Sequence, residues 1–163
     1  PYKGNRNHLI RPVHYDALRE KPISLGATMS ENQEADDDVG IASTQYNGWI
    51  VHVDKDLNQL PGWHYNPIKG EEYYVTEEEG LRSFYTQLLT GDRIDNIVGL
   101  YGIGPVKAAK LLKGCEGEQS LFQAVVGAYK AANEPLDRVL ENGRLLWLSR
   151  HQGQRWEFPN ESV

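Results

Sequence analysis

The sequence predicts an α/β protein in which a parallel sheet is followed by a helical region. Up to about residue 90, short runs rich in β-branched and aromatic residues alternate with segments that have apolar residues at helical spacing, a pattern typical of a parallel sheet. Beyond residue 91, the recognisable segments all have helical spacing. Hydrophobic residues make up 39% and charged residues 25% of the 163-residue chain, which is the length and composition of a globular domain with a buried core.

The first part of the chain is expected to contain two helices and two strands. Apolar Ala35, Val39 and Ala42 lie at helical spacing and predict a helix over 34–46. The run 49–53, Trp-Ile-Val-His-Val, is short and β-branched and follows Asn-Gly, which predicts a buried strand. The other elements expected in this part are a short helix over 13–20 and a second strand over 73–75.

Capping and turn residues mark the helices of the second part. Thr76 and Glu79 have the spacing of a capping box, so a helix is expected to begin after Thr76 and to continue until Gly91 stops it. Three glycines within 99–104 predict a tight hairpin, and Pro105 suits the first turn of the next helix. That helix is expected to end at Gly114 and to be followed by amphipathic helices over 119–132 and 135–149.

Composition and charge indicate which partners and which cellular compartments suit the chain. The formal net charge of −6 argues mildly against a nucleic-acid partner, but the acids are clustered and the basic residues gather elsewhere, in 1–21 and around Lys107. No stretch is apolar for long enough to span a membrane, and no signal peptide is recognisable, so no membrane partner is expected. The lone Cys115 excludes an internal disulfide framework and fits a reducing compartment.

Three groups of acidic residues are candidates for a metal site. They are Glu34, Asp36 and Asp37 at the start of a predicted helix, Asp54 and Asp56 just past a predicted strand, and Asp92 and Asp95 in the turn after Gly91. In α/β sheets, ligands bind at the carboxyl ends of strands. Side chains two residues apart in extended chain point the same way, so we expect Asp54 and Asp56 to face one site.

Carboxylates in this number, with no His or Cys among them, are the ligands that Mg²⁺ or Mn²⁺ takes in preference to Zn²⁺. Like charges at one site repel, and bound cations would make such a cluster tolerable. The chemistry that uses it is two-metal hydrolysis of a phosphodiester. Each group also has an ordinary structural explanation, as acids of a first helical turn or as residues of polar loops. The combination of the three groups favours the metal site.

The segment from Gly99 to Lys107 has the glycine pattern of a helix-hairpin-helix motif. Gly102 and Gly104 allow positive φ and close backbone approach, and free amides at the start of the following helix can bind a phosphate. Lys107 and Lys110 lie about one turn apart and are expected to line one DNA backbone without base specificity. The alternative is a glycine-rich turn followed by a solvated helix face.

Together these motifs resemble the flap endonuclease family, which includes the 5′-nuclease domain of bacterial DNA polymerase I and the bacteriophage 5′–3′ exonucleases. Residues 91–99, 102–104 and 107–112 are similar to the signature of that family. Residues 34–40 and 53–60 resemble its second and third acidic motifs, and residues 2–6, Tyr-Lys-Gly-Asn-Arg, resemble the segment that enters its helical arch. The likeness covers about residues 2–150, and within the family it is greatest to the phage exonucleases.

The resemblance implies a PIN-like, or resolvase-like, 5′-nuclease core. Residues 1–90 would form a partial α/β nuclease core with the arch base at 1–30. Residues 91–163 would form the helix-hairpin-helix and C-terminal helical region of the same continuous unit. The implied activity is that of a structure-specific 5′–3′ exonuclease or flap endonuclease that cuts DNA at 5′ ends, flaps or nicks, with two Mg²⁺ or Mn²⁺ ions in the complete enzyme.

The resemblance also assigns roles to single residues. Glu34 and Asp36 would help hold the first metal, with Asp37 adjacent to it. Lys3 and Arg6 would face the scissile phosphate and stabilise developing charge. The second metal region would contain Asp54, Asp56, Asp92 and Asp95. The residues that would grip the duplex away from the cut are Gly102, Gly104, Lys107 and Lys110.

The chain departs from the family in one respect that affects activity. The family's N-terminal strand and the segment after it each supply a metal-ligand aspartate, and this chain, which begins with Pro1, contains neither. We therefore expect weak or no cleavage unless the missing N-terminal segment is supplied. Two alternatives stay open, a non-catalytic fragment that binds duplex DNA and a PIN-type ribonuclease, although the Gly-Ile-Gly hairpin argues against the second. A monomer in the bacterial cytoplasm is expected, in the host's if a phage encodes it.

Overall fold

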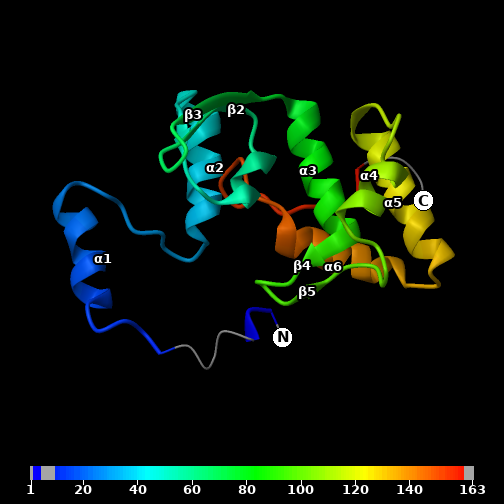
Figure 1. Cartoon of the computed structure of the whole chain (residues 1–163), viewed down its shortest axis with the longest axis horizontal. Helices are drawn as coiled ribbons and strands as arrows, with labels where there is room; N and C mark the ends of the chain where they lie inside the picture. The colour runs from blue at the N-terminus through cyan, green and yellow to red at the C-terminus, as the bar shows by residue number, and fades with distance from the viewer. Residues whose placement is uncertain (1, 5–9, 160–163) are drawn as a thin grey trace.

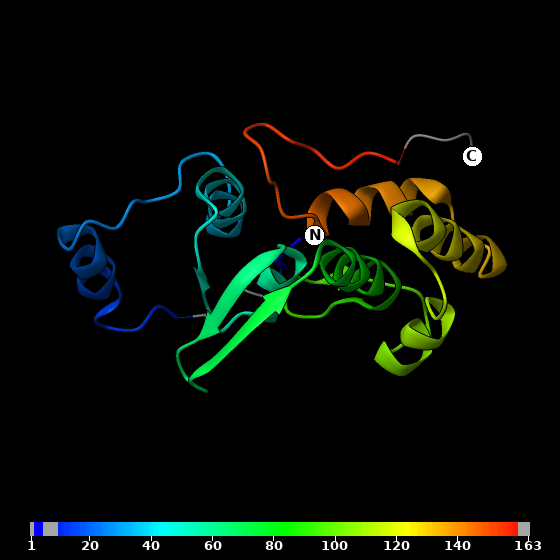
Figure 2. The ribbon, with the colours of Figure 1, turned by 90° about the horizontal axis from the view of Figure 1, so that it is seen from above.

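The computed structural model describes residues 2–4 and 10–159 and shows an α/β fold, in which a small sheet lies beside a larger group of helices (Figures 1 and 2). In chain order the elements are α1 (Tyr15–Ser24), α2 (Ala35–Tyr46), β1 (Ile50–Val51), the 3₁₀ helix η2 (Lys55–Gln59), β2 (Gly62–Asn66), β3 (Glu71–Val75), α3 (Glu77–Thr90), β4 (Gly91–Asp92), β5 (Ile97–Val98), α4 (Pro105–Leu111), α5 (Gly117–Ala131) and α6 (Leu136–Leu146). No helix within the described ranges is long and apolar enough to cross a membrane.

The main sheet is mixed, whereas the sequence predicted a parallel one. In the strand order β1-β2-β3, β1 pairs with β2 in parallel and β2 pairs with β3 antiparallel. The difference comes from β2, which the sequence pattern does not reveal and which forms a hairpin with β3. Asn66 closes this hairpin, because its Oδ1 accepts hydrogen bonds from the backbone amides of Ile68 and Lys69.

Strand β1 is shorter and more exposed than the buried strand predicted over 49–53. Only Ile50 and Val51 pair with β2. Ile50 is buried, whereas the side chains of Val51 and Val53 are 62% and 63% exposed. Successive side chains of a strand point to opposite faces, so one face of β1 packs on the core and the other lies open in the described structure. The prediction of a strand is confirmed, and the prediction that it is buried throughout is wrong.

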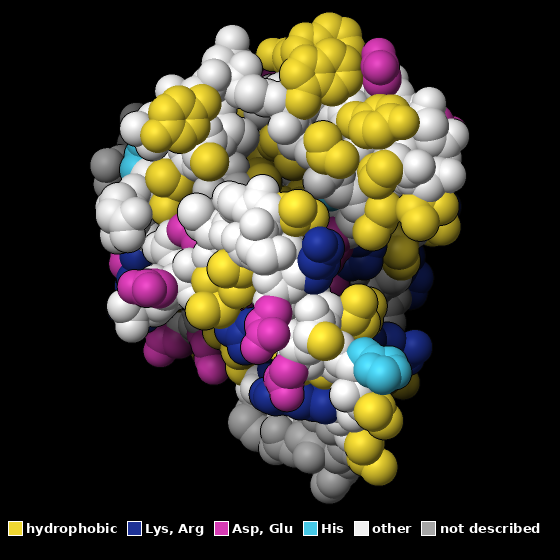
Figure 3. All heavy atoms as spheres, turned by 90° about the vertical axis from the view of Figure 1, so that its left-hand side faces the viewer, with side chains coloured by type: hydrophobic (Ala, Val, Ile, Leu, Met, Phe, Trp, Pro, Cys, Tyr) yellow, Lys and Arg dark blue, Asp and Glu magenta, His cyan; other side chains and the backbone are white. Residues whose placement is uncertain are grey.

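Aromatic rings occupy the open face of the sheet. Trp49 stacks on Trp63 of β2 with ring centroids 5.3 Å apart, and Tyr74 of β3 meets Trp63 edge to face. All three side chains are about half exposed. Figure 3 shows apolar side chains gathered on the upper part of the molecule, where β2 and β3 lie in Figure 1. The rings therefore shield one another in part, without a second layer of the described chain over them.

Helix α3 is the centre of the main hydrophobic core. It begins at the predicted capping box, in which the Thr76 hydroxyl accepts from the Glu79 amide and the Glu79 carboxylate accepts from the Thr76 amide. It ends at Gly91, also as predicted. Helices α4, α5 and α6 pack against its buried face, which contributes the fully buried Phe84, Tyr85, Leu88 and Leu89. The three predicted helices beyond residue 104 are confirmed, with ends shifted by a few residues.

A second, small core holds the acid-bearing segment of η2 against α2. Ile50 of β1 packs there with Leu57 and Leu60, and Val39 of α2 and Leu148 cover the cluster. The predicted helix over 34–46 is confirmed as α2, with Glu34 as its N-cap. The acids of α2 and those around η2 are therefore brought together by the apolar contacts of their neighbours.

The segment that carries α1 stands apart from both cores. Figures 1 and 2 both show α1 at the edge of the molecule, away from the sheet and the other helices. The helix predicted over 13–20 is confirmed, although it begins and ends later, and none of its residues is buried. Helix α1 thus receives no stabilisation from a core, which is the usual source of stability for a helix of this length.

Gly40 sets how closely α2 approaches the C-terminal segment. A Cβ at this position would collide with the backbone carbonyl oxygen of Ser149, so we expect Gly40→Ala to lower the free energy of unfolding by about 1–3 kcal/mol. Gly127 in α5 is the matched control, because a Cβ there meets nothing within 4 Å. Gly127→Ala should raise the free energy of unfolding by roughly 0.5–1 kcal/mol through helix propensity. Urea denaturation measures both, and effects of the same sign would contradict the packing argument.

Candidate metal and nucleic-acid site

Five carboxylates from distant parts of the chain line one small cavity of about 40 Å³. They are Glu34, Asp36, Asp56, Asp92 and Asp95. Tyr2, Gln59 and Gln87 supply polar groups to the same cavity, and leucines at the end of α6 and just after it close it. The structure therefore brings together five of the seven predicted metal ligands.

The other two predicted ligands have structural contacts and do not line the cavity. Asp37 accepts a hydrogen bond from the backbone amide of Ser149 at 2.8 Å, which ties α2 to the C-terminal segment. Asp54 caps η2 by accepting from the backbone amide of Asp56 at 3.0 Å. Asp54 still lies close enough to influence the cavity, since its charge helps to raise the pKa of Asp36.

Asp92 is the most deeply placed acid of the cluster, with 6% of the residue exposed. Its Oδ1 accepts from the backbone amides of Ile94 at 2.7 Å and Asp95 at 3.3 Å, and its Oδ2 accepts from Lys55 Nζ at 2.8 Å. Burial by itself would raise the pKa of Asp92, but the hydrogen bonds from Lys55 and the two amides lower it below its ordinary value. The short β4–β5 hairpin thus holds an ionised carboxylate.

Two lysines lie at the cluster, and the ammonium group of each is placed between two carboxylates. Lys55 Nζ lies 2.8 Å from both Asp56 Oδ1 and Asp92 Oδ2. Lys3 Nζ lies 2.8 Å and 2.7 Å from the two oxygens of Glu34, and its distance to Asp95 Oδ2 is 3.9 Å. These amines neutralise part of the negative charge that the cluster concentrates. Arg6, the other predicted catalytic residue, lies outside the described residues.

The remaining acid, Asp36, shows the cost of gathering like charges. Burial raises the pKa of Asp36, and the nearby charges of Asp54, Glu34 and Asp56 raise it further. The Tyr2 hydroxyl donates to Glu34 Oε1 at 2.8 Å, and burial raises the pKa of Tyr2 to about 12. The five carboxylates therefore carry more negative charge than Lys3 and Lys55 can neutralise, which favours the binding of further cations.

The carboxylates of the cavity are chemically suited to Mg²⁺ or Mn²⁺, although their side chains are not arranged around a common metal position. All its acidic ligands are hard carboxylate oxygens, which these ions prefer. Within the described ranges, however, no three His, Cys, Asp or Glu side chains converge closely enough to hold a metal ion. The carboxylates instead meet in pairs around an ammonium group, which shows that the site accepts a cation between them.

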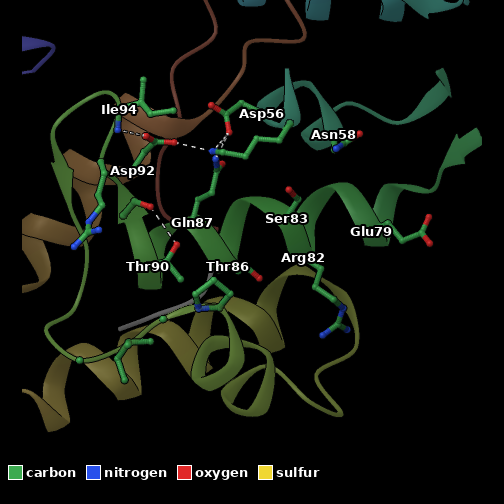
Figure 4. A pocket seen from close by; sticks show the side chains of 17 residues that line it. Asp56, Asn58, Glu79, Arg82, Ser83, Thr86, Gln87, Thr90, Asp92 and Ile94 are labelled. Carbon is green, nitrogen blue, oxygen red and sulfur yellow. Dashed lines mark hydrogen bonds and ion pairs between the residues drawn. The ribbon is translucent and has the colours of Figure 1, made fainter. Parts of the chain in front are cut away.

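An open groove of about 1060 Å³ leads away from this cluster along α3. Figure 4 shows Asp56, Gln87 and Asp92 converging at one end, with Arg82 and Glu79 farther along the same helix. Ser83, Thr86 and Thr90 line its floor, and residues 102–105 form its other wall. The groove therefore connects the carboxylates with the predicted DNA-binding turn.

The glycine turn agrees only in part with its prediction. Gly102 has a φ of +72°, the left-handed conformation expected of it. Gly104 has a φ of −99° in extended backbone, and a Cβ there would meet nothing within 4 Å, so positive φ does not explain this glycine. Pro105 opens α4 as predicted, and Lys107 and Lys110 are exposed on that helix. The helix-hairpin-helix assignment stays a prediction.

Several residues of the site escaped the sequence analysis. Gln87 of α3 donates to Asp56 Oδ1, and Gln59 donates to Gln87 Oε1 at 2.7 Å. Lys55 is visible in the sequence between two acids, but its partner Asp92 is 37 positions away. Nothing local marks either glutamine, because each owes its role to the packing of α3 against η2.

A buried histidine pair positions the start of η2. His52 Nδ1 lies 2.6 Å from the carbonyl oxygen of Asp54, and His52 Nε2 lies 2.7 Å from His64 Nδ1. His64 Nε2 in turn lies 2.9 Å from the carbonyl oxygen of Leu60. This chain of contacts links the residue after β1, strand β2 and both ends of η2.

We expect stability to fall in mild acid because of His64. Burial lowers the pKa of His64 below its ordinary value, so the unfolded state binds the proton more readily than the folded state. The free energy of unfolding should therefore be highest above the ordinary histidine pKa and should decrease as the pH falls below it. Urea midpoints at neutral and mildly acidic pH, for the unchanged chain, His64→Gln and the exposed control His151→Gln, measure this. A pH dependence that persists in His64→Gln would contradict it.

In sequence, the chain is similar to part of bacterial DNA polymerase I. It is 33% identical over 130 residues to the Rhizobium leguminosarum polymerase and 31% identical over 131 residues to that of Borreliella burgdorferi. These matches cover 69% and 71% of this chain, which spans only 13% and 14% of the length of the two polymerases. No family model matches the chain.

In fold, the chain is similar to a bacteriophage T5 protein that was co-crystallised with metal ions, with a TM-score of 0.62 at 17% identity over 89% of this chain and 67% of the other. A T5 flap endonuclease in a complex with DNA and metal ions gives a TM-score of 0.61 at 16% identity, over 89% and 66% of the two chains. The chain thus shares sequence with DNA polymerase I and its fold with the T5 nuclease, which confirms the predicted resemblance to the flap endonuclease and 5′–3′ exonuclease family.

Proposed function

We propose that the chain acts as a metal-dependent 5′-nuclease on DNA with 5′ ends, flaps or nicks. The observation that carries this proposal is the cavity in which Glu34, Asp36, Asp56, Asp92 and Asp95 meet, at one end of a groove that leads to the glycine turn. The acids come from the same motifs that resemble the family. Metal ions are present in the two T5 structures, and DNA in one of them, which supports the same partners here.

In this proposal the five carboxylates hold Mg²⁺ or Mn²⁺, and Asp54 and Asp37 support them from outside the cavity. Metal ions held there would supply an activated water and stabilisation of the negative charge that develops during phosphodiester hydrolysis. Lys3, beside Glu34 and Asp95, is placed to stabilise charge that develops on the scissile phosphate. The resemblance implies two further aspartates from an upstream segment, so we propose that cleavage by these residues alone is weak.

The proposal is tested by incubating the chain with a 5′-labelled flap duplex in Mg²⁺ and, in parallel, in EDTA. Product from the flap that requires Mg²⁺ supports a 5′-nuclease. A single-stranded RNA of the same sequence distinguishes a PIN-type ribonuclease, which would cut the RNA instead. If neither substrate is cut, adding the upstream segment should restore cleavage of the flap. Continued inactivity, together with retained duplex binding, would favour a non-catalytic DNA-binding protein.

We expect Lys107 and Lys110 to contribute non-specific affinity for duplex DNA. Both are exposed on α4 beside the glycine turn, so each can neutralise a backbone phosphate. Replacing both with methionine should weaken binding uniformly across sequences and should reduce the slope of log affinity against log salt by about 2. Fluorescence anisotropy with a labelled duplex at several salt concentrations measures the slope. The exposed Lys130→Met is the control, and an equal loss in both proteins would argue against a specific role for α4.

A further inference from the structure

The structure leaves one disagreement between the proposed chemistry and the arrangement of the acids. The carboxylates suit a divalent metal, but within the described residues no three of them converge closely enough to hold a metal ion. The side chain that separates Asp56 from Asp92 is Lys55, whose ammonium lies 2.8 Å from an oxygen of each. The position between these two acids is therefore already filled by a cation that belongs to the chain.

We propose that Lys55 is a displaceable counterion, which holds Asp56 and Asp92 together in the absence of metal and leaves them when a divalent metal binds. This inference rests on the proposed metal-dependent function. Magnesium binds oxygen at about 2.0–2.1 Å, so an ion on Asp56 and Asp92 would take the lone pairs that the ammonium uses, and the two cations would repel one another.

The surroundings of Lys55 allow this movement. Its side chain is 63% exposed, whereas that of Asp92 is 6% exposed and that of Asp56 is 27% exposed. Asp92 is fixed by the amides of Ile94 and Asp95, and Asp56 by Gln87. The acids would therefore stay in place while the flexible lysine turns away, since only Lys55 has both solvent access and rotamer freedom.

The place into which Lys55 would turn is also defined. Lys55, Asp56 and Asp92 line the near end of the groove along α3, and Arg82 and Arg93 line the same groove. A displaced ammonium at this end would face a polyanion that lies in the groove. Lys55 would thus exchange its carboxylate partners for a phosphate of the nucleic acid. Metal binding would in this way release the Lys55 ammonium at a place where the substrate carries negative charge.

The first test compares metal affinity between Lys55→Met and Lys69→Met by calorimetric titration with Mn²⁺ alone. Methionine keeps the length of the stem and removes the ammonium. Lys69 is the matched control, because it is equally exposed and its own partner, Glu71, lies outside the cluster. Lys55→Met should bind Mn²⁺ roughly fivefold more tightly than the unchanged chain, because a competing ion pair is absent. Lys69→Met should bind as the unchanged chain does.

The second test uses the unchanged chain, so that it does not depend on the folding of a variant. Lysines are acetylated with an N-hydroxysuccinimide ester with and without Mn²⁺, and the extent at each lysine is read by mass spectrometry. Mn²⁺ should increase acetylation of Lys55 and leave Lys69 unchanged. Unchanged acetylation of Lys55 at saturating Mn²⁺, or equal or weaker Mn²⁺ binding by Lys55→Met, would overturn the proposal. Failure of every protein to bind Mn²⁺ would overturn it as well.

These outcomes are separate from the fate of the proposed nuclease. Mg²⁺-dependent flap cleavage with no change in the acetylation of Lys55 would support the nuclease proposal and contradict the displacement of Lys55. Mn²⁺ could instead displace Lys55 in a chain that never cuts flap DNA, even with the upstream segment added. That result would support the counterion role of Lys55 and contradict the nuclease proposal.

Discussion

Replacing Asp92 with asparagine is expected to lower Mg²⁺-dependent cleavage of a flap duplex by on the order of a hundredfold or more, because the site loses a charged metal ligand. The fold should survive this change. The amide oxygen of asparagine can still accept from the backbone amides of Ile94 and Asp95, which hold the β4–β5 turn. Lys55 would lose one of its two carboxylate partners at the same time.

The cleavage rate is measured on a 5′-labelled flap, with Mg²⁺ binding followed by calorimetry on the same proteins. Asp137→Asn is the control, because Asp137 is an exposed acid in the first turn of α6 and does not line the carboxylate cavity. If the chain needs its upstream segment for cleavage, all proteins are compared with that segment added. Cleavage and Mg²⁺ affinity of Asp92→Asn equal to those of the control would remove Asp92 from the set of metal ligands.

Truncating Phe84 to alanine is expected to lower the free energy of unfolding by about 3–5 kcal/mol. Phe84 is fully buried in α3, and its ring lies 5.0 Å from the Trp147 ring and 5.3 Å from the Trp156 ring, measured between centroids. The cavity left by the ring would remove contacts that join α3 to the segment after α6. A loss of this size is a large fraction of the stability of a domain.

Urea denaturation followed by tryptophan fluorescence measures this effect, since Trp147 and Trp156 report directly on the packing around Phe84. Phe84→Leu is the control, because it retains an apolar side chain and should cost less than the alanine variant. Mg²⁺ binding should persist in Phe84→Ala at temperatures where it remains folded, since Phe84 lines neither the groove nor the carboxylate cavity. A loss of stability below about 1 kcal/mol would show that the core relaxes to fill the cavity.

Local sequence was sufficient for the features that depend on residues close together in the chain. The capping box of Thr76 and Glu79 is found as predicted, because its hydrogen bonds join residues three positions apart. Gly91 ends α3, and Gly102 has the predicted positive φ, because both depend on the backbone of one residue. The motifs around the acids were also sufficient to indicate the family that the sequence and fold comparisons support.

Tertiary structure decided which acids meet and what lies between them. Asp36 faces the cavity while its neighbour Asp37 binds the amide of Ser149, a difference that depends on where the C-terminal segment crosses α2. The sheet is mixed because β2 turns back on β3, and no periodicity in the sequence marks β2. Lys55 reaches Asp92 across 37 positions only because α3 packs against η2. The hydrogen bonds of caps and tight turns join residues a few positions apart. Contacts between distant segments instead follow from burial of apolar surface, which is non-directional and leaves no local pattern.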